Sequence, residues 1–138
     1  MKNIGKAIIL WTLGGCIYMA IELLWRGYSH WTMFILGGIC FEFLDYINIY
    51  LKWETPLWKQ MLIGGMGITI LEFITGCIVN LWLGMDVWDY SNLPFNILGQ
   101  ICLPFTFIWI LLAGVGIVLS DYLRYWIFDE EKPHYVLI

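Results

Sequence analysis

Two glutamates stand in the middle of long apolar segments, where a carboxylate is costly. Glu42 lies in the segment 31–51 and Glu72 in the segment 61–83. A charged side chain at the centre of a bilayer costs at least about 2.5–3.5 kcal/mol, so such groups face the protein interior and mark cation or proton pathways. We therefore predict that Glu42 and Glu72 handle a cation or a proton. The structural alternative is that they hydrogen-bond between helices.

A second group of polar residues is expected at one end of these segments. Glu22 and Arg26 are spaced i, i+4, in the favourable order for a helical ion pair, and the Arg26 guanidinium suits an anionic group. Asp89, Asn96 and Gln100 follow the third segment, although Asn96 also fits the N-cap of a fourth helix. The predicted substrate- or ion-binding set is therefore Glu22, Arg26, Glu42, Glu72, Asp89, Asn96 and Gln100.

Other kinds of site are not indicated by the sequence. No Ser-His-Asp or Cys-His pattern suggests a catalytic set, and we expect His30 and His134 on opposite sides of a membrane. The four cysteines lack metal-ligand spacing, and no Walker A motif is present. The net charge is −4, with no cluster of basic residues. We predict no metal, no cofactor, no ATPase activity and no nucleic-acid partner.

The composition predicts that membrane helices position these residues. The chain of 138 residues is 61% hydrophobic and 13% charged, whereas soluble domains have about 45–50% apolar and about 25% charged residues. A helix of about 20 apolar residues crosses a bilayer. We predict an all-α integral membrane protein, a four-transmembrane-helix bundle in a single membrane domain covering residues 1–138. The four spans are 4–25, 31–51, 61–83 and 97–119.

The distribution of basic residues predicts the orientation of the bundle. Cytoplasmic loops of membrane proteins carry an excess of Lys and Arg. Arg26 is alone on one side, so we expect a multi-pass protein of the cell membrane with both termini cytoplasmic. The run 129–131 is then expected to be a solvated cytoplasmic face. The basic residues of the predicted cytoplasmic side are Lys2, Lys6, Lys52, Lys59, Arg124 and Lys132.

An internal similarity suggests a duplication. With an offset of 62 residues, 28–43 and 90–105 share eight of sixteen residues, including Tyr-Ser and a cysteine at fixed positions. Chance similarity between two apolar segments is the alternative. A duplication predicts two tandem parallel helix-pair repeats, 4–56 and 57–124, related by an axis along the membrane normal.

Three short motifs follow one another in the sequence: E-F-I-T-G at 72–76, W-D-Y-S at 88–91 and N-x-x-G at 96–99. Together they resemble the bacterial family of small membrane proteins known as putative ABC-transporter type IV. Related vertebrate four-span proteins are similar around 27–31 and Glu42. The resemblance covers roughly 22–119 and implies a permease-like multi-pass protein. Bacterial members often carry Arg or Lys where Gln100 stands, so the resemblance assigns no role of that cation to Gln100.

Three functions are compatible with these residues. The first is a transporter or permease component in the lipid bilayer, acting as a homo-oligomer or with a separate partner subunit, because four spans enclose little volume. The second is an intramembrane enzyme acting on a lipid, with carboxylates as acid and base and Arg26 on a headgroup. The third is a non-catalytic scaffold, in which neighbouring groups satisfy every carboxyl.

Overall fold

The computed structural model describes residues 4–51 and 55–135. Within these ranges the chain forms four α-helices, which confirms the predicted all-α class, and one short antiparallel hairpin that pairs Asn96 with Cys102. A π-helical segment continues the third helix. The elements are α1 (Ile4–Arg26), α2 (Trp31–Tyr50), α3 (Leu57–Gly76), η1 (Cys77–Trp82), β1 (Asn96–Ile97), β2 (Ile101–Cys102) and α4 (Leu103–Phe128).

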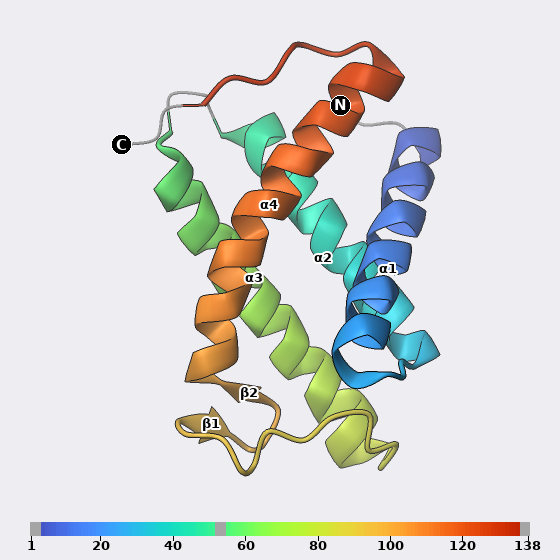
Figure 1. Cartoon of the computed structure of the whole chain (residues 1–138), viewed down its shortest axis with the longest axis vertical. Helices are drawn as coiled ribbons and strands as arrows, with labels where there is room; N and C mark the ends of the chain where they lie inside the picture. Colours follow the sequence, from blue (N-terminus) through green and yellow to red (C-terminus); the bar gives the residue numbers. More distant parts are fainter. Residues whose placement is uncertain (1–3, 52–54, 136–138) are drawn as a thin grey trace.

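The second helix is the centre of the bundle. α2 packs against α1, α3 and α4, and α3 also packs along α4, whereas the main partner of α1 is α2 (Figure 1). The start of α1 and the end of α4 lie at one end of the molecule, and the hairpin lies at the other. The core is apolar and includes Met33, Leu36, Cys40, Leu44, Ile68, Ala113 and Ile117.

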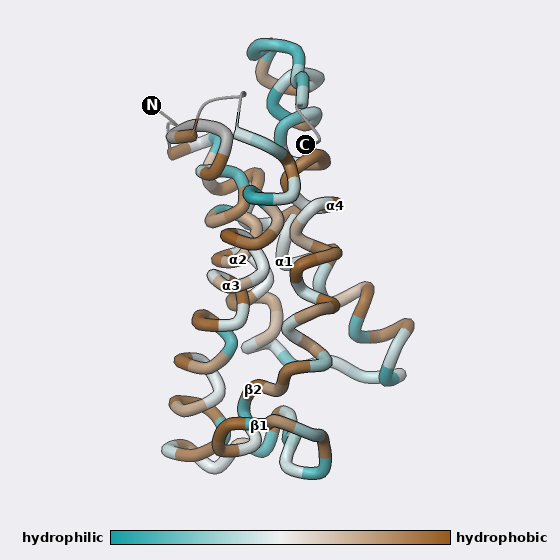
Figure 2. Tube along the Cα trace, turned by 90° about the vertical axis from the view of Figure 1, so that its left-hand side faces the viewer, coloured by the Kyte–Doolittle hydropathy of each residue, from teal (hydrophilic) through white to brown (hydrophobic). Residues whose placement is uncertain are grey.

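Three stretches of the described chain are long and apolar enough to cross a membrane: Ile4–Arg26, Leu57–Trp82 and Leu103–Phe128. Figure 2 shows mostly hydrophobic residues along the helices, with hydrophilic residues gathered towards the two ends. Helix α2, which carries Glu42 and Asp45, is not among the three. The fold is therefore that of a helical membrane protein, and the predicted span 31–51 is not confirmed as a span.

The fourth helix begins six residues after its predicted start. We predicted a span at 97–119, but α4 runs from Leu103 to Phe128. Pro104 lies in the first turn of α4, where its fixed φ is favourable and its missing N–H costs nothing. Before it, Leu98 and Gly99 have φ values of 54° and 74°, which turn the chain into the hairpin instead of a helix.

The same hairpin bears on the proposed repeat. Cys40 lies inside α2, whereas Cys102, its partner in the duplication, lies in β2 before α4 begins. The two similar segments therefore differ in local structure. The structure does not confirm the tandem repeat.

Candidate functional site

Glu72 is buried between the helices and is held by two hydrogen bonds. Its side chain is 2% exposed. The Trp109 indole N–H of α4 donates to Glu72 Oε1 (3.2 Å), and the Tyr90 hydroxyl, from the loop before β1, donates to Oε2 (3.1 Å). Sequence reasoning found Glu72 but neither donor, because the three residues belong to separate segments.

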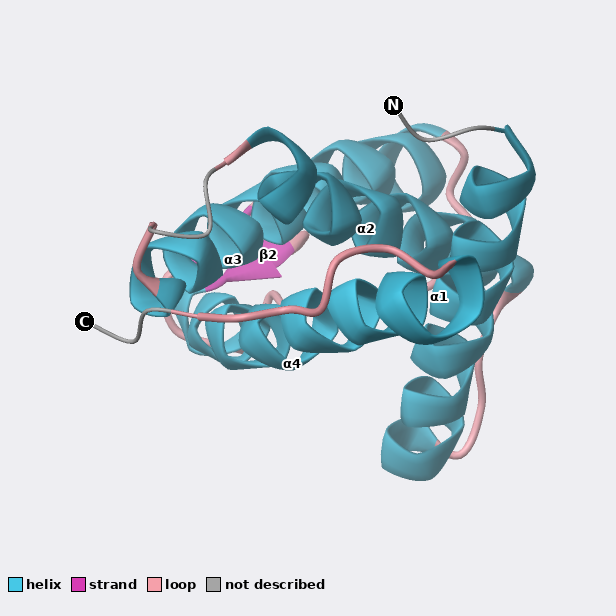
Figure 3. Ribbon diagram, turned by 90° about the horizontal axis from the view of Figure 1, so that it is seen from above, coloured by secondary structure: helices cyan, strands magenta, loops and turns pink. Residues whose placement is uncertain are grey.

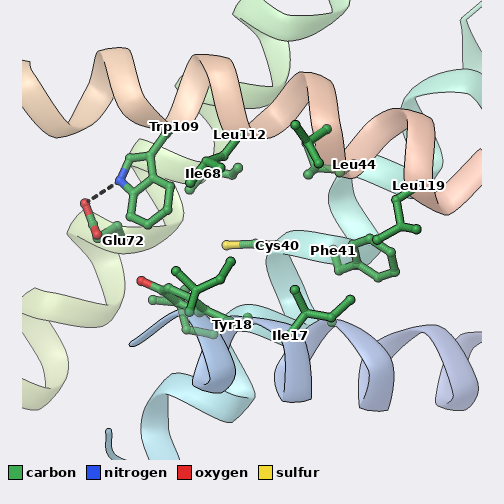
Figure 4. A pocket seen from close by; sticks show the side chains of 16 residues that line it. Ile17, Tyr18, Cys40, Phe41, Leu44, Ile68, Glu72, Trp109, Leu112 and Leu119 are labelled. Atoms are coloured by element: carbon green, nitrogen blue, oxygen red, sulfur yellow. Dashed lines mark hydrogen bonds between the residues drawn. The ribbon is translucent and has the colours of Figure 1, made fainter. Parts of the chain in front are cut away.

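A cavity of about 130 Å³ adjoins Glu72 and receives side chains from all four helices (Figure 4). Glu72 lies at one end of this cavity, and Phe41 and Leu119 lie at the other. Apart from the carboxylate, the Tyr18 hydroxyl and the Cys40 thiol, the labelled lining is apolar. The lining includes Gly14, Ile17, Tyr18, Leu36, Cys40, Phe41, Leu44, Ile68, Glu72, Trp109, Leu112, Val115 and Leu119.

Aromatic rings surround the carboxylate end of the cavity. The Tyr18 and Trp109 rings meet edge to face, with centroids 5.8 Å apart. The Tyr90 ring stacks on Phe105 at 4.8 Å, and Phe105 lies 6.5 Å from Trp109. These contacts fix the orientation of both hydrogen-bond donors to Glu72.

A second cavity, of about 140 Å³, extends the first between α1 and α4. The two share Tyr18, Trp109 and other lining residues, and the second reaches Glu22 and Trp25 near the end of α1. Together they form one groove, which we call the α1–α4 groove. It runs from Leu119, past Glu72, to Glu22.

Glu22 and Arg26 form the ion pair that their spacing predicted, with 2.6 Å between Glu22 Oε2 and Arg26 Nε. Arg26 Nη1 donates to the carbonyl of Val87 (3.2 Å), and the guanidinium lies over the ring of Tyr28. The Arg26 side chain therefore links the end of α1 to the loop after η1 through this hydrogen bond. A role of this pair in binding a ligand stays a prediction.

Asp89 and Asn96 shape the loop and hairpin beyond η1. Hydrogen bonds from the side chain and backbone of Ser91 hold the pKa of Asp89 below its usual value. Asn96 Oδ1 accepts from the Gly99 N–H (3.1 Å). The alternative of Asn96 as the N-cap of the fourth helix is wrong, because that position is Cys102.

Gln100 lies in the turn between β1 and β2, and its side chain is buried. Its Oε1 accepts from Asn80 Nδ2 (2.8 Å), and its carbonyl accepts from the Trp88 indole N–H (3.0 Å). Among the described residues lining the α1–α4 groove, neither Gln100 nor Glu42 appears. Glu42 and Gln100 therefore do not line the groove that Glu72 faces. A role of these two residues in binding a substrate or ion stays a prediction.

A cluster of charged residues lies at the opposite end of the bundle. Arg124 donates to Asp45 Oδ1 (2.7 Å) and to Asp121, and its third contact is Glu130 Oε1 (3.2 Å). The Tyr135 hydroxyl donates to Asp121 (2.8 Å), and the segment after α4 crosses this end of the bundle, over α4 (Figure 3). We call Arg124, Asp45, Asp121 and Glu130 the Arg124 cluster.

The prediction that 129–131 is a solvated face is wrong for Glu130, because this residue belongs to the Arg124 cluster. Lys6 pairs with Glu130 at 2.8 Å. Burial alone raises the pKa of Glu130, but Lys6 and Arg124 outweigh burial and hold that pKa below its usual value. Sequence analysis missed this cluster, although the i, i+3 spacing of Asp121 and Arg124 is a signal that could have identified part of it.

One comparison with known proteins finds a family. A family model described as putative ABC-transporter type IV matches residues 4–136. The match agrees with the motif resemblance and extends it to nearly the whole chain. No curated protein and no solved structure matches the chain.

Proposed function

The chain belongs to the putative ABC-transporter type IV family, and on this premise we propose that it is a membrane-spanning component of a transport system. The observation that carries the proposal is Glu72, an ionisable group 2% exposed that faces a cavity between four helices. Buried carboxylates between membrane helices are typical of cation and proton pathways. We assign the handling of the transported cation or proton to Glu72.

The proposed assembly follows from the small size of the bundle. Four helices enclose a cavity of about 130 Å³, whereas sites for ligands of drug size measure about 300–1,000 Å³. We propose that the chain works as a homo-oligomer or with a separate subunit. If ATP drives transport, a partner must supply the ATPase, because the sequence has no Walker A motif.

A scaffold is the competing function, and one observation favours it. Both oxygens of Glu72 accept hydrogen bonds, as a purely structural carboxyl would. The substitution Glu72→Gln separates the two functions, because an amide retains hydrogen bonding across helices but cannot carry a negative charge.

We expect Glu72→Gln to lower cation or proton flux to the level of protein-free liposomes. The measurement is reconstitution with a cation- or pH-sensitive dye, at matched amounts of folded protein. Glu131→Gln, in the exposed segment after α4, is the control and keeps the wild-type flux. Wild-type protein without flux, or Glu72→Gln with normal flux, contradicts the assignment. Glu42→Gln tests the second glutamate in the same assay. If this variant also loses the cation or proton flux, the transport pathway includes α2.

We propose that both termini are cytoplasmic, which makes the loop containing Ser91 external. Ser91 is exposed, and its loop between η1 and β1 lies at the end of the bundle opposite the start of α1 and the end of α4. Two of the basic residues behind this orientation, Lys2 and Lys52, lie outside the described residues. In a chain whose native cysteines are replaced by serine, Ser91→Cys is expected to react with an impermeant maleimide on intact cells. If the Ser91→Cys variant reacts only after the cells are permeabilised, the orientation is the opposite of the one proposed.

A further inference from the structure

We propose that the α1–α4 groove binds lipophilic organic monocations, with the cationic head against Glu72 and beside the rings of Tyr18 and Trp109. The apolar remainder of the molecule then lies in the groove between the two helices. This inference rests on the proposed function and names its substrate class.

The charge of Glu72 is the first argument. Its two hydrogen-bond donors, Trp109 and Tyr90, are neutral, and in the part of the chain that the structure describes Glu72 forms no ion pair. The nearby cation Arg26 is paired with Glu22. A carboxylate offers about four lone-pair sites, of which these donors use two. An ionised Glu72 therefore has both charge and acceptor capacity for a bound cation.

The surrounding rings are the second argument. The faces of Trp and Tyr attract cations, and cages of such rings recognise quaternary ammonium groups. Tyr18 and Trp109, whose centroids are 5.8 Å apart, both line the cavity beside Glu72 (Figure 4). This combination of one carboxylate and aromatic rings suits a cation that carries its own apolar surface.

The lining excludes two other ligand classes on chemical grounds. Inorganic cations such as Ca²⁺ and Mg²⁺ need about six or more oxygen ligands. Around the first cavity the described side chains supply oxygen atoms only from the Glu72 carboxylate and the Tyr18 hydroxyl, and the second cavity adds the Glu22 carboxylate, which is paired with Arg26. These side-chain oxygens are too few for such an ion. An anion is disfavoured, because it would enter a low-dielectric space beside a carboxylate.

Size and access are the third argument. The groove consists of two adjacent spaces of about 130 and 140 Å³ that share lining residues, and an apolar cavity of about 150 Å³ holds one benzene ring. A head and a ring-sized apolar group therefore fit. Val115 and Ile17 line the groove and are 63% and 37% exposed, so it opens sideways to the hydrocarbon of the membrane.

The test compares three probes of similar shape and different charge. They are benzyltrimethylammonium, its neutral isostere neopentylbenzene, and the anion phenylacetate. Binding is measured by titration calorimetry on the full chain in lipid nanodiscs, with the heat of empty nanodiscs subtracted. We expect saturable binding of the cation, roughly tenfold to hundredfold weaker binding of the isostere, and none of the anion, because only the cation is attracted by the Glu72 carboxylate and by the faces of the aromatic rings.

Variants locate the binding within the groove. Glu72→Gln is expected to weaken binding of the cation by roughly tenfold or more while leaving the neutral isostere unchanged. Val115→Trp, which fills the groove at an exposed position, should weaken the binding of both probes. Glu131→Gln is the matched control and leaves both affinities unchanged. If Glu72→Gln does not fold, the inference is tested by the affinities of Val115→Trp and by the preference of the wild type for the cation over its neutral isostere.

The outcomes separate this inference from the proposed function. Equal affinity for the cation and its isostere, or unchanged cation affinity in Val115→Trp or folded Glu72→Gln, overturns the inference. Selective cation binding without any flux supports the inference and contradicts the transport function. Flux of inorganic cations or protons without binding of benzyltrimethylammonium supports transport and overturns the inference.

Discussion

Replacing Arg124 by alanine is expected to lower the free energy of unfolding by about 3–5 kcal/mol, because it removes the guanidinium that pairs with two buried carboxylates. Asp45 is 0% exposed and Asp121 is 1% exposed. Both accept hydrogen bonds from the Arg124 guanidinium, which therefore joins α2 to α4 at the end of the bundle where α4 ends. Without it, the carboxylates must be protonated or drawn towards water, and either change loosens the contact between α2 and α4.

The measurement is reversible unfolding in mixed micelles, followed by circular dichroism. Lys132→Ala is the control, because Lys132 is exposed and forms no ion pair in the described part of the chain; its effect should stay within about 0.5 kcal/mol. The triple variant Arg124→Met, Asp45→Asn, Asp121→Asn removes the charges together and should recover most of the loss. A loss below about 1 kcal/mol in Arg124→Ala would mean that water reaches both carboxylates.

Hydrophobic pattern predicted the helices well, because the length and apolar character of a membrane helix are properties of one continuous segment. The predicted spans 4–25 and 31–51 match α1 and α2 within one residue at each end. The prediction was wrong at α4, where apolar residues from Ile97 onwards looked helical. There, Pro104 and the positive φ values of Leu98 and Gly99 outweigh hydropathy, and side chains that resemble a span form a hairpin.

The candidate site was predictable only one residue at a time. Glu72 was identifiable because a carboxylate in an apolar segment is costly wherever that segment packs. Its partners Tyr90 and Trp109 are 18 and 37 positions away, and Asp45 is 79 positions from Arg124. No local spacing encodes such contacts. They depend on how the helices cross, which the apolar pattern leaves open.

The close contact of α3 with α4 is expected to be the least tolerant of substitution. A Cβ added at Gly65 would touch Ile110 Cγ1 and lie 2.7 Å from its Cα and 2.8 Å from its N. Backbone atoms cannot rotate aside, so the two helices must move apart. Gly65→Ala should therefore cost about 3 kcal/mol, the upper end for overpacking, despite a gain of about 1 kcal/mol in helix propensity.

Gly114→Ala is the matched control in the same pair of helices. Its Cβ would lie 2.9 Å from Met61 Cε and 3.0 Å from Met61 Sδ, which are the flexible end of a side chain. Met61 can adopt another rotamer, so we expect unchanged stability or a gain of up to about 1 kcal/mol. Both variants are compared by the same unfolding measurement. If Gly65→Ala is as stable as Gly114→Ala, α3 and α4 do not approach at Gly65.

Separating α3 from α4 also acts on the site, because Gly65 and Glu72 lie two turns apart on α3. Thr69 lies between them and donates to Thr106 of α4 (3.3 Å), and Glu72 accepts from Trp109 (3.2 Å). Both bonds cross the contact that Gly65→Ala would widen. Folded Gly65→Ala protein should therefore bind benzyltrimethylammonium more weakly than Gly114→Ala protein, since the ring of Trp109 moves away from the carboxylate. Equal affinity in the two variants would show that the Glu72 site does not depend on this helix contact.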